Sequence, residues 1–318
     1  MMLKCQTYQP VDAYTRDILK KLLHFHEDDS GNQPVVVVAP AKSPTHSMRV
    51  YAHGALIGAI PVNPSYYTNS RCKFFDANYL KSAGLSLTDD DHAILERIDR
   101  SDNLATDKEI FQSAAYLNLA CKAAKMRWSG DKTGGALERD IETAILKYNW
   151  SHHDHWVISD MEYNLEHHGG KMDYGCICCD CNTISQFCLM ELKANASACA
   201  GESGLTKHYR DMREHFDTFP KIRQTMVERY NRLIAAGLLP GEQIEEIPDD
   251  LPLLFGFLFH KGNGLQTQAD AVSLSAQELR KVTPDFANDT RLRFLFLNNV
   301  QEKTLDQMQT WEAFSHTS

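Results

Sequence analysis

The chain has 318 residues, of which 43% are hydrophobic and 24% charged, so it can bury a sizeable core and its length suits about two domains. Its formal net charge of −9 gives no global basic signature, so a polyanion would have to meet a local positive patch. The start lacks the apolar core of a signal peptide and no run approaches roughly 18 apolar residues, which predicts a cytoplasmic protein with no membrane partner.

The first part of the chain predicts a small sheet with helices. Apolar residues at helical spacing predict a helix from Val11 to Phe25. A β-branched run between prolines predicts a strand from Pro34 to Ala39, and residues 49–61 predict a second strand or a hairpin. A long apolar-rich stretch from Asp107 to Trp128 predicts another helix. These elements do not indicate what this part of the chain does.

Glycines and polar residues between Ser129 and Gly135 indicate a boundary or hinge. The sequence therefore predicts an N-terminal mixed α/β domain over residues 1–129 and a second domain over residues 130–318. In the second domain, a helix from Ala136 to Tyr148 carries Glu138 and Glu142 on one flank, one turn apart.

Further elements follow along the second domain. Two of the later strands are so apolar that they are expected in the middle of a sheet covered on both faces. Pro220 interrupts a helical pattern and divides it into two helices. The predicted elements are strand 156–163, a hairpin over 171–194, helix 205–219, helix 221–236, strand 251–260 and strand 291–298.

The hairpin from Lys171 to Ala194 is predicted to close in a tight turn at Asp180–Thr183. Asp173 opens its first strand, and Glu191 and Lys193 close its second. Because side chains alternate along a strand, Glu191 and Lys193 lie on one face, and the turn brings Asp173 beside them. Charged groups at the ends of apolar strands are costly to bury unless they pair or hold a metal, so this hairpin is predicted to carry a site.

The order of helix, three strands, helix and two strands from residue 136 resembles the PD-(D/E)XK nuclease superfamily over residues 130–300. The motif that carries the resemblance is Met172-Asp173 followed by Glu191-Leu192-Lys193, and Met172 stands where the family usually has proline. The resemblance implies a restriction endonuclease-like core in an α/β (α+β) fold, with a mixed central sheet flanked by helices.

The resemblance also implies a metal-dependent endonuclease that hydrolyses phosphodiester bonds of nucleic acid, with DNA favoured over RNA and RNA left open. Such hydrolysis needs an activated water and a neutralised phosphate, which Mg²⁺ or Mn²⁺ supplies. Asp173, Glu191 and the backbone carbonyl of Leu192 are expected to hold the ion. Lys193 is expected to orient or deprotonate the water and to stabilise the developing charge.

Further residues receive roles from the same resemblance. Glu138 matches the first-helix glutamate that completes a second metal site or its water shell, and Glu142 is its rival. Since Arg139 and Lys147 lie on the same helix, the alternative interpretation of each glutamate is an exposed helix charge. The helix after the hairpin carries a positive strip of Lys207, His208, Arg210 and Arg213 that is suited to phosphates near the site, and a solvated face is the equal alternative; Lys207, Arg210 and Arg213 are the candidates for binding nucleic acid. Domains of this kind joined to an unfamiliar N-terminal module often serve restriction or anti-phage defence, and often act as homo-oligomers.

Two alternative hypotheses stand beside the nuclease. In the first, the charges only form an ion-paired network, and a catalytically inactive scaffold binds nucleic acid or a protein partner. In the second, the thiols of Cys176, Cys178, Cys179 and Cys181 bind zinc. These residues lack two Cys-x-x-Cys pairs and point alternately up and down along a strand, which favours reduced thiols that only pack.

Overall fold

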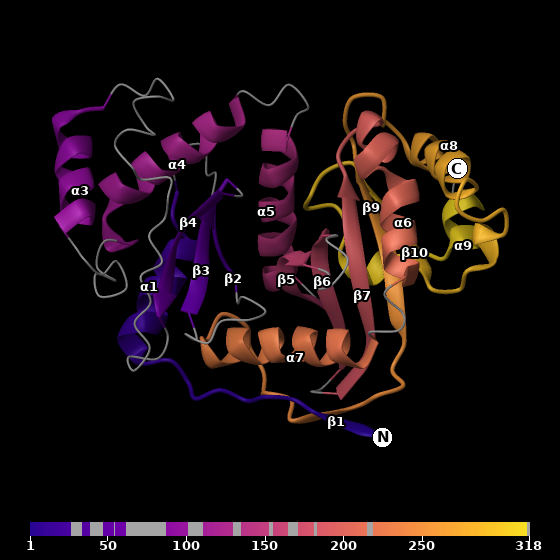
Figure 1. Cartoon of the computed structure of the whole chain (residues 1–318), viewed down its shortest axis with the longest axis horizontal. Coiled ribbons are helices and arrows are strands. Elements are labelled where there is room, and N and C mark those ends of the chain that lie inside the picture. The colour runs from indigo at the N-terminus through magenta and orange to yellow at the C-terminus, as the bar shows by residue number, and fades with distance from the viewer. Residues whose placement is uncertain are drawn as a thin grey trace. The chain divides into compact units, whose positions relative to one another are not determined.

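The computed structural model describes residues 1–26, 34–38, 47–53, 55–61, 87–100, 111–129, 135–152, 155–164, 171–180, 183–214 and 219–316 (Figure 1). The fold is mixed α/β, as the sequence predicted. The chain forms two compact units: unit 1 contains residues 1–7, 145–231 and 241–318, and unit 2 contains residues 8–144 and 232–240.

The division between the units runs inside two helices, α5 (Gly135–His152) and α7 (Phe219–Ala235). The sequence instead predicted one boundary, between residues 129 and 130. A continuous helix carries no composition signal at such a crossing, so a linker search does not find it. The centre of the predicted hinge, residues 130–134, lies outside the described residues.

Unit 2 contains a three-stranded antiparallel sheet in the order β2-β3-β4. Its helix α1 packs on β2 and buries Ile18, Leu19 and Leu22 completely, so the apolar spacing that predicted this helix faces the core. The predicted strand and hairpin are confirmed. The elements of unit 2 before α5 are α1 (Ala13–Leu23), β2 (Val35–Val38), β3 (Ser47–Ala52), β4 (Ala55–Pro61), α3 (Asp89–Arg100) and α4 (Ala114–Ser129).

Unit 1 is built on a five-stranded mixed sheet in the order β10-β9-β7-β6-β5. The strands β5, β6 and β7 form an antiparallel meander, and β9 and β10 then add in parallel to β7. Along the chain, the three strands of the meander are followed by α6 (Leu205–Glu214), α7 and β9, and α8 (Gln268–Leu279), which the sequence did not predict, separates β9 from β10. The strands are β5 (Trp156–Asn164), β6 (Lys171–Asp180), β7 (Thr183–Lys193), β9 (Leu253–His260) and β10 (Leu292–Leu297).

The two very apolar strands occupy different places in this sheet. The strand β9 lies between β7 and β10 and buries every residue from Leu253 to Phe259, as expected for a central strand. The expectation for β10 was wrong, because β10 is the edge strand. Its side chains pack on the C-terminal helix α9 (Trp311–His316), and Phe294 and Gln309 exchange two backbone hydrogen bonds of 2.9 Å at its outer edge. This covering accounts for the apolar sequence of an edge strand.

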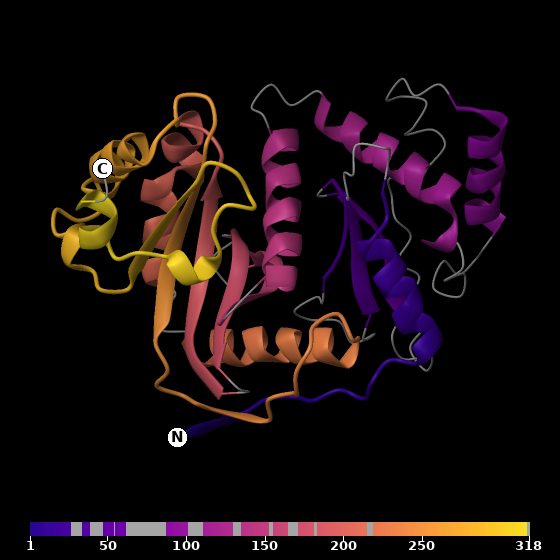
Figure 2. The same cartoon turned by 180° about the vertical axis from the view of Figure 1, so that it is seen from behind.

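Helices cover the sheet of unit 1 on the side that carries the site. The helix α6 (Leu205–Glu214) contacts β9 and α8 (Gln268–Leu279), and it lies in front of the sheet in Figure 1 and behind it in Figure 2. Pro220 lies in the first turn of α7, where its missing N–H costs no helical hydrogen bond. None of the described helices combines the length and the apolar composition needed to cross a membrane.

A short two-stranded antiparallel sheet pairs β1 (Met2–Lys4) with β8 (Glu246–Pro248). The sequence did not predict either strand. Three residues are too few to show an alternating pattern, so only the pairing of distant segments defines these strands.

A polar network anchors α6 to the segment that enters β10. The hydroxyl of Tyr209 donates to Oδ2 of Asp289 at 2.7 Å, and Arg291 donates to both carboxylate oxygens of Asp289 at 2.7 Å. Burial alone raises the pKa of Asp289, but the hydrogen bonds from Arg291 and Tyr209 lower this pKa by more, so it lies below its ordinary value of 3.8.

The lowered pKa of Asp289 predicts a pH-dependent contribution to stability. Because the unfolded chain takes up the proton first as the pH falls, the stabilisation is fully present above about pH 3.8 and is lost as the pH falls through the lower pKa of the folded state. Asp289→Asn should lower the free energy of unfolding by about 1.5–3 kcal/mol at pH 7, measured by urea unfolding, and by progressively less below about pH 3.8. The exposed Asp285→Asn is the control, and an equal cost at all pH values would contradict the prediction.

Candidate active site

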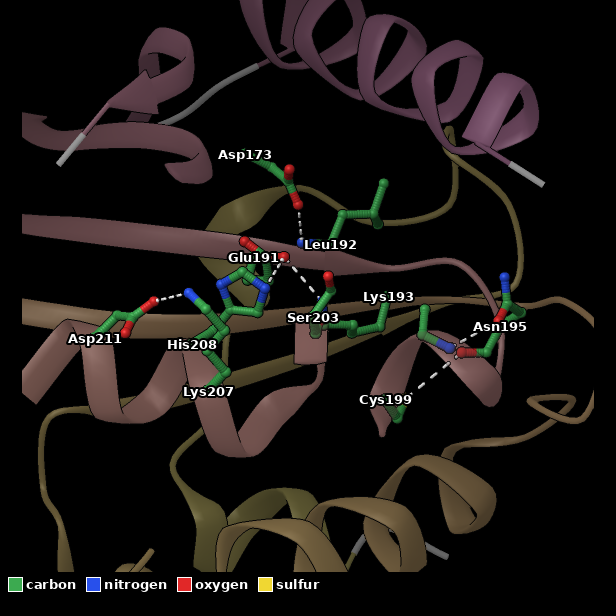
Figure 3. A network of polar contacts seen from close by, with 11 residues as sticks. Asp173, Glu191, Leu192, Lys193, Asn195, Cys199, Ser203, Lys207, His208 and Asp211 are labelled. Atoms are coloured by element: carbon green, nitrogen blue, oxygen red, sulfur yellow. Dashed lines mark hydrogen bonds and ion pairs between the residues drawn. The ribbon is translucent and has the colours of Figure 1, made fainter. Parts of the chain in front are cut away.

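The two strands of the predicted hairpin separate at the end that carries the charged residues. The register of β6 and β7 runs from Asp180↔Thr183 beside the turn to Tyr174↔Met190, and the turn residues 181 and 182 lie outside the described part of the chain. Beyond Met190, the carboxylate of Asp173 takes the place of a backbone partner, because its Oδ2 accepts a hydrogen bond of 2.6 Å from the backbone N–H of Leu192 (Figure 3).

This hydrogen bond also orients the carbonyl of Leu192. In an antiparallel ladder the N–H and C=O of one residue point to the same edge of its strand. Since the N–H of Leu192 points to Asp173, its C=O points to that edge as well, where the register with β6 has already ended. A carboxylate oxygen and a carbonyl oxygen are therefore directed to the same edge of β7.

Glu191 and Lys193 form a buried ion pair on one face of β7. Their exposed fractions are 4% and 2%, because β7 lies inside the sheet with α6 on the face that they share. Nζ of Lys193 donates to Oε1 of Glu191 at 2.8 Å and to the backbone carbonyl of Ser203 at 2.9 Å. The alternation that the sequence predicted thus places these two charges together.

The imidazole of His208 joins this ion pair from α6. Its Nε2 lies 2.9 Å from Oε1 of Glu191, the oxygen that also accepts from Lys193. Burial raises the pKa of Glu191, but the charge of Lys193 and the hydrogen bond and charge of His208 outweigh it. The pKa of Glu191 therefore lies below its ordinary value, and the group is a carboxylate at neutral pH.

The second oxygen of Glu191 has a different environment. Oε2 is buried and has no hydrogen-bond partner among the residues that the structure describes. An unpaired buried carboxylate oxygen is costly, and a hard cation with oxygen ligands satisfies such an atom. The donor set of Glu191, Asp173 and the Leu192 carbonyl therefore suits Mg²⁺ or Mn²⁺.

The segment between β7 and α6 forms the wall that holds Lys193. It consists of two short turns, η3 (Ser197–Cys199) and η4 (Gly201–Ser203), and Gly204 then begins α6 by accepting from the backbone N–H of His208 at 3.2 Å. A Cβ on Gly204 would lie 2.6 Å from the backbone carbon of Ala200 and 2.7 Å from the carbonyl oxygen of Cys199. Only glycine fits where the backbone folds this closely.

Gly204→Ala should therefore move the backbone that carries the carbonyl of Ser203 away from Lys193. We expect the free energy of unfolding to fall by about 1–3 kcal/mol in urea unfolding. In a Lys193→Met background the cost should be smaller, because no ammonium remains to lose its acceptor.

Ser203→Ala is the matched control, because its side chain is exposed and the carbonyl that contacts Lys193 is kept. This control should change stability by less than about 0.5 kcal/mol. If Gly204→Ala lowered the free energy of unfolding equally in the unmodified chain and in the Lys193→Met chain, the segment between β7 and α6 would not act through Lys193.

The two candidate glutamates of α5 differ in their environments within unit 2. Glu142 is buried and accepts a hydrogen bond of 2.9 Å from Arg139, whereas Glu138 is only half-buried. The interpretation of Glu142 as an exposed helix charge was therefore wrong. The two side chains lie one turn apart on α5, as predicted, and the roles assigned to them stay predictions.

The predicted positive strip of α6 is divided between two faces of the helix, so the prediction was wrong for His208. Lys207, Arg210 and Arg213 are exposed, although Lys207 pairs with Asp211 at 2.5 Å. His208 instead belongs to the buried face. The buried residues of this helix are Leu205, His208, Tyr209 and Met212. Their spacing of three and four residues was the signal that could have placed His208 inside.

The described cysteines of the hairpin are free thiols. Cys176 is completely buried opposite Cys188 on β7, and burial raises the pKa of both thiols. Cys178 and Cys179 are half-exposed, and Cys181 lies outside the described residues. All the cysteines that the structure describes are free thiols, as predicted, and no group of three or more metal-ligand side chains found there includes one.

Comparisons with known proteins do not assign the chain to a family. No family model, no curated protein and no solved structure matches the chain. The functional argument therefore depends on the residues of the site.

Proposed function

We propose that unit 1 hydrolyses phosphodiester bonds of DNA with a divalent cation, Mg²⁺ or Mn²⁺, in the manner of the PD-(D/E)XK nucleases that its motif resembles. One observation carries the proposal: the buried carboxylate of Glu191 keeps Oε2 without a hydrogen-bond partner among the described residues, at the end of the strand that also presents Leu192 and Lys193. The antiparallel meander followed by parallel strands supports the resemblance in topology.

Each residue of this site has a proposed part. Asp173, Glu191 and the carbonyl of Leu192 hold the cation, which when bound neutralises a phosphate and lowers the pKa of a water. Lys193, held by two acceptors, keeps its ammonium beside the carboxylate and stabilises charge that develops at the phosphate. Lys207, Arg210 and Arg213 on the exposed face of α6 bind the DNA backbone.

The biological setting belongs to the proposal as well. Restriction or anti-phage defence in the cytoplasm, with a homo-oligomer cutting both strands, accords with the free thiols and with the resemblance. Unit 2 would then contribute recognition or regulation.

A specific observation favours a second candidate function. Lys193 is 2% exposed, and its Nζ donates to Oε1 of Glu191 and to the carbonyl of Ser203, as in a structural ion pair. A scaffold without catalysis, which binds nucleic acid or a protein partner, fits this arrangement and requires no cation. The zinc hypothesis has no comparable support.

Cleavage of plasmid and linear DNA by the full chain distinguishes these functions. We expect nicking or linearisation with Mg²⁺ or Mn²⁺ and none with EDTA. Asp173→Ala and Lys193→Ala should each lower the rate by about 10²–10⁴-fold, because each removes a group that acts on the cation or the reacting water.

Lys122→Ala, at an exposed position of α4 in unit 2, is the control and should cleave like the unmodified chain. Cleavage that survives both site substitutions would contradict the assigned site. Absence of cleavage in every sample, together with absence of cation binding, would favour the scaffold.

A further inference from the structure

His208 is a buried polar residue that the nuclease motif does not include. It is 8% exposed, although its neighbours Lys207 and Arg210 on α6 are exposed. Its Nε2 lies 2.9 Å from Oε1 of Glu191, although neither ring nitrogen has the full geometry of a hydrogen bond to a residue in the described part of the chain. The buried face of α6 thus places an imidazole beside Glu191. Burying this polar ring costs desolvation free energy, which an apolar side chain at this position would not cost.

The two oxygens of Glu191 are divided between two environments. Oε1 faces Nζ of Lys193 at 2.8 Å and Nε2 of His208 at 2.9 Å, whereas Oε2 has no hydrogen-bond partner among the described residues (Figure 3). One donor, Nζ of Lys193, and the contact with Nε2 of His208 on the same oxygen restrict the torsion of the carboxyl group. The other oxygen is then left in a fixed direction, available to a ligand.

The oxygen of Glu191 that His208 faces distinguishes two roles for this residue. Nε2 of His208 lies beside Oε1, which also accepts from Lys193, whereas Oε2 is the oxygen without a hydrogen-bond partner among the described residues. His208 therefore fits a place behind Glu191 better than a place in the ligand set.

We propose that His208 is a positioning residue, which donates from Nε2 to Oε1 of Glu191 and so aims Oε2 at a divalent cation. This inference rests on the proposed function, in which Glu191 holds that cation. The role requires the ring proton on Nε2. Donors that orient a metal-binding carboxylate from behind commonly change metal affinity by about 10–100-fold when they are removed.

The anchoring of α6 supports this role. Tyr209, the next residue, is tied through its hydroxyl to Asp289 at 2.7 Å, and Gly204 begins the helix in a position that excludes a larger residue. The backbone of α6 is thus held both before and after His208 in the sequence. A positioning residue needs such support, because its effect depends on a fixed distance to its partner.

Two substitutions of His208 test whether an N–H donor at the position of Nε2 is required, or the imidazole ring itself. The side-chain amide of glutamine can place its N–H where Nε2 lies, whereas the shorter asparagine places its amide near Nδ1 and does not reach Glu191. The probe is Mn²⁺ binding to the full chain, measured by calorimetry and by the Mn²⁺ electron paramagnetic resonance signal. His208→Asn should weaken Mn²⁺ binding by about 10–100-fold, and His208→Gln should retain most of the affinity.

Controls keep the test clear of folding effects. Glu214→Gln, at an exposed position of the same helix, should bind Mn²⁺ like the unmodified chain. Circular dichroism and urea unfolding show whether each variant is folded. If His208→Asn does not fold, His208→Phe replaces it, since phenylalanine keeps a ring and has no donor, and the same weakening is expected.

Three outcomes would overturn the proposal in different ways. Unchanged Mn²⁺ affinity in folded His208→Asn, with binding lost in Glu191→Gln, would leave the cation site intact and remove the role of His208. Nitrogen coupling to Mn²⁺ in pulsed resonance spectra that disappears in both His208 variants would make His208 a direct ligand. No Mn²⁺ binding by the unmodified chain would overturn the proposed function, and this inference with it.

Discussion

The candidate site depends on one buried carboxylate. Glu191 lies inside the sheet on β7, where an isolated charge would be very costly, and it remains charged because Lys193 and His208 both face its Oε1. Lys193 lies on the same strand as Glu191, whereas His208 lies on α6. The carboxylate therefore links the strand to the helix.

The surrounding structure keeps that link in place. The backbone turns between β7 and α6 bring the carbonyl of Ser203 to Lys193, and Gly204 permits the close fold of this segment. Tyr209, the residue after His208 on α6, donates a hydrogen bond to Asp289, which precedes β10. After β9, Gly262 lies so close to the carbonyl oxygen of Ala194 that a Cβ there would overlap it. Glycines and polar anchors thus fix the segments around β7, while its apolar residues fill the core.

A second buried ion pair shows what a purely structural pair looks like in the same unit. Asp160 on β5 pairs with Arg229 on α7, and both side chains are buried. Neither carboxylate oxygen of Asp160 is among the buried side-chain atoms without a hydrogen-bond partner, whereas Oε2 of Glu191 is. The open buried oxygen of the Glu191 carboxylate is the reason to assign chemistry to Glu191 and not to Asp160.

The sequence by itself determined the strands that carry the site and the spacing of the motif. The alternation in Glu191-Leu192-Lys193 sets both charges on one face of a strand, and the apolar runs of β9 and β10 define strands, because these signals are local. Only the tertiary structure decided which oxygen of Glu191 is paired, that β10 lies at the edge and that His208 meets Glu191. Those facts depend on contacts between segments far apart in the chain, and the periodicity of one segment does not specify its partner.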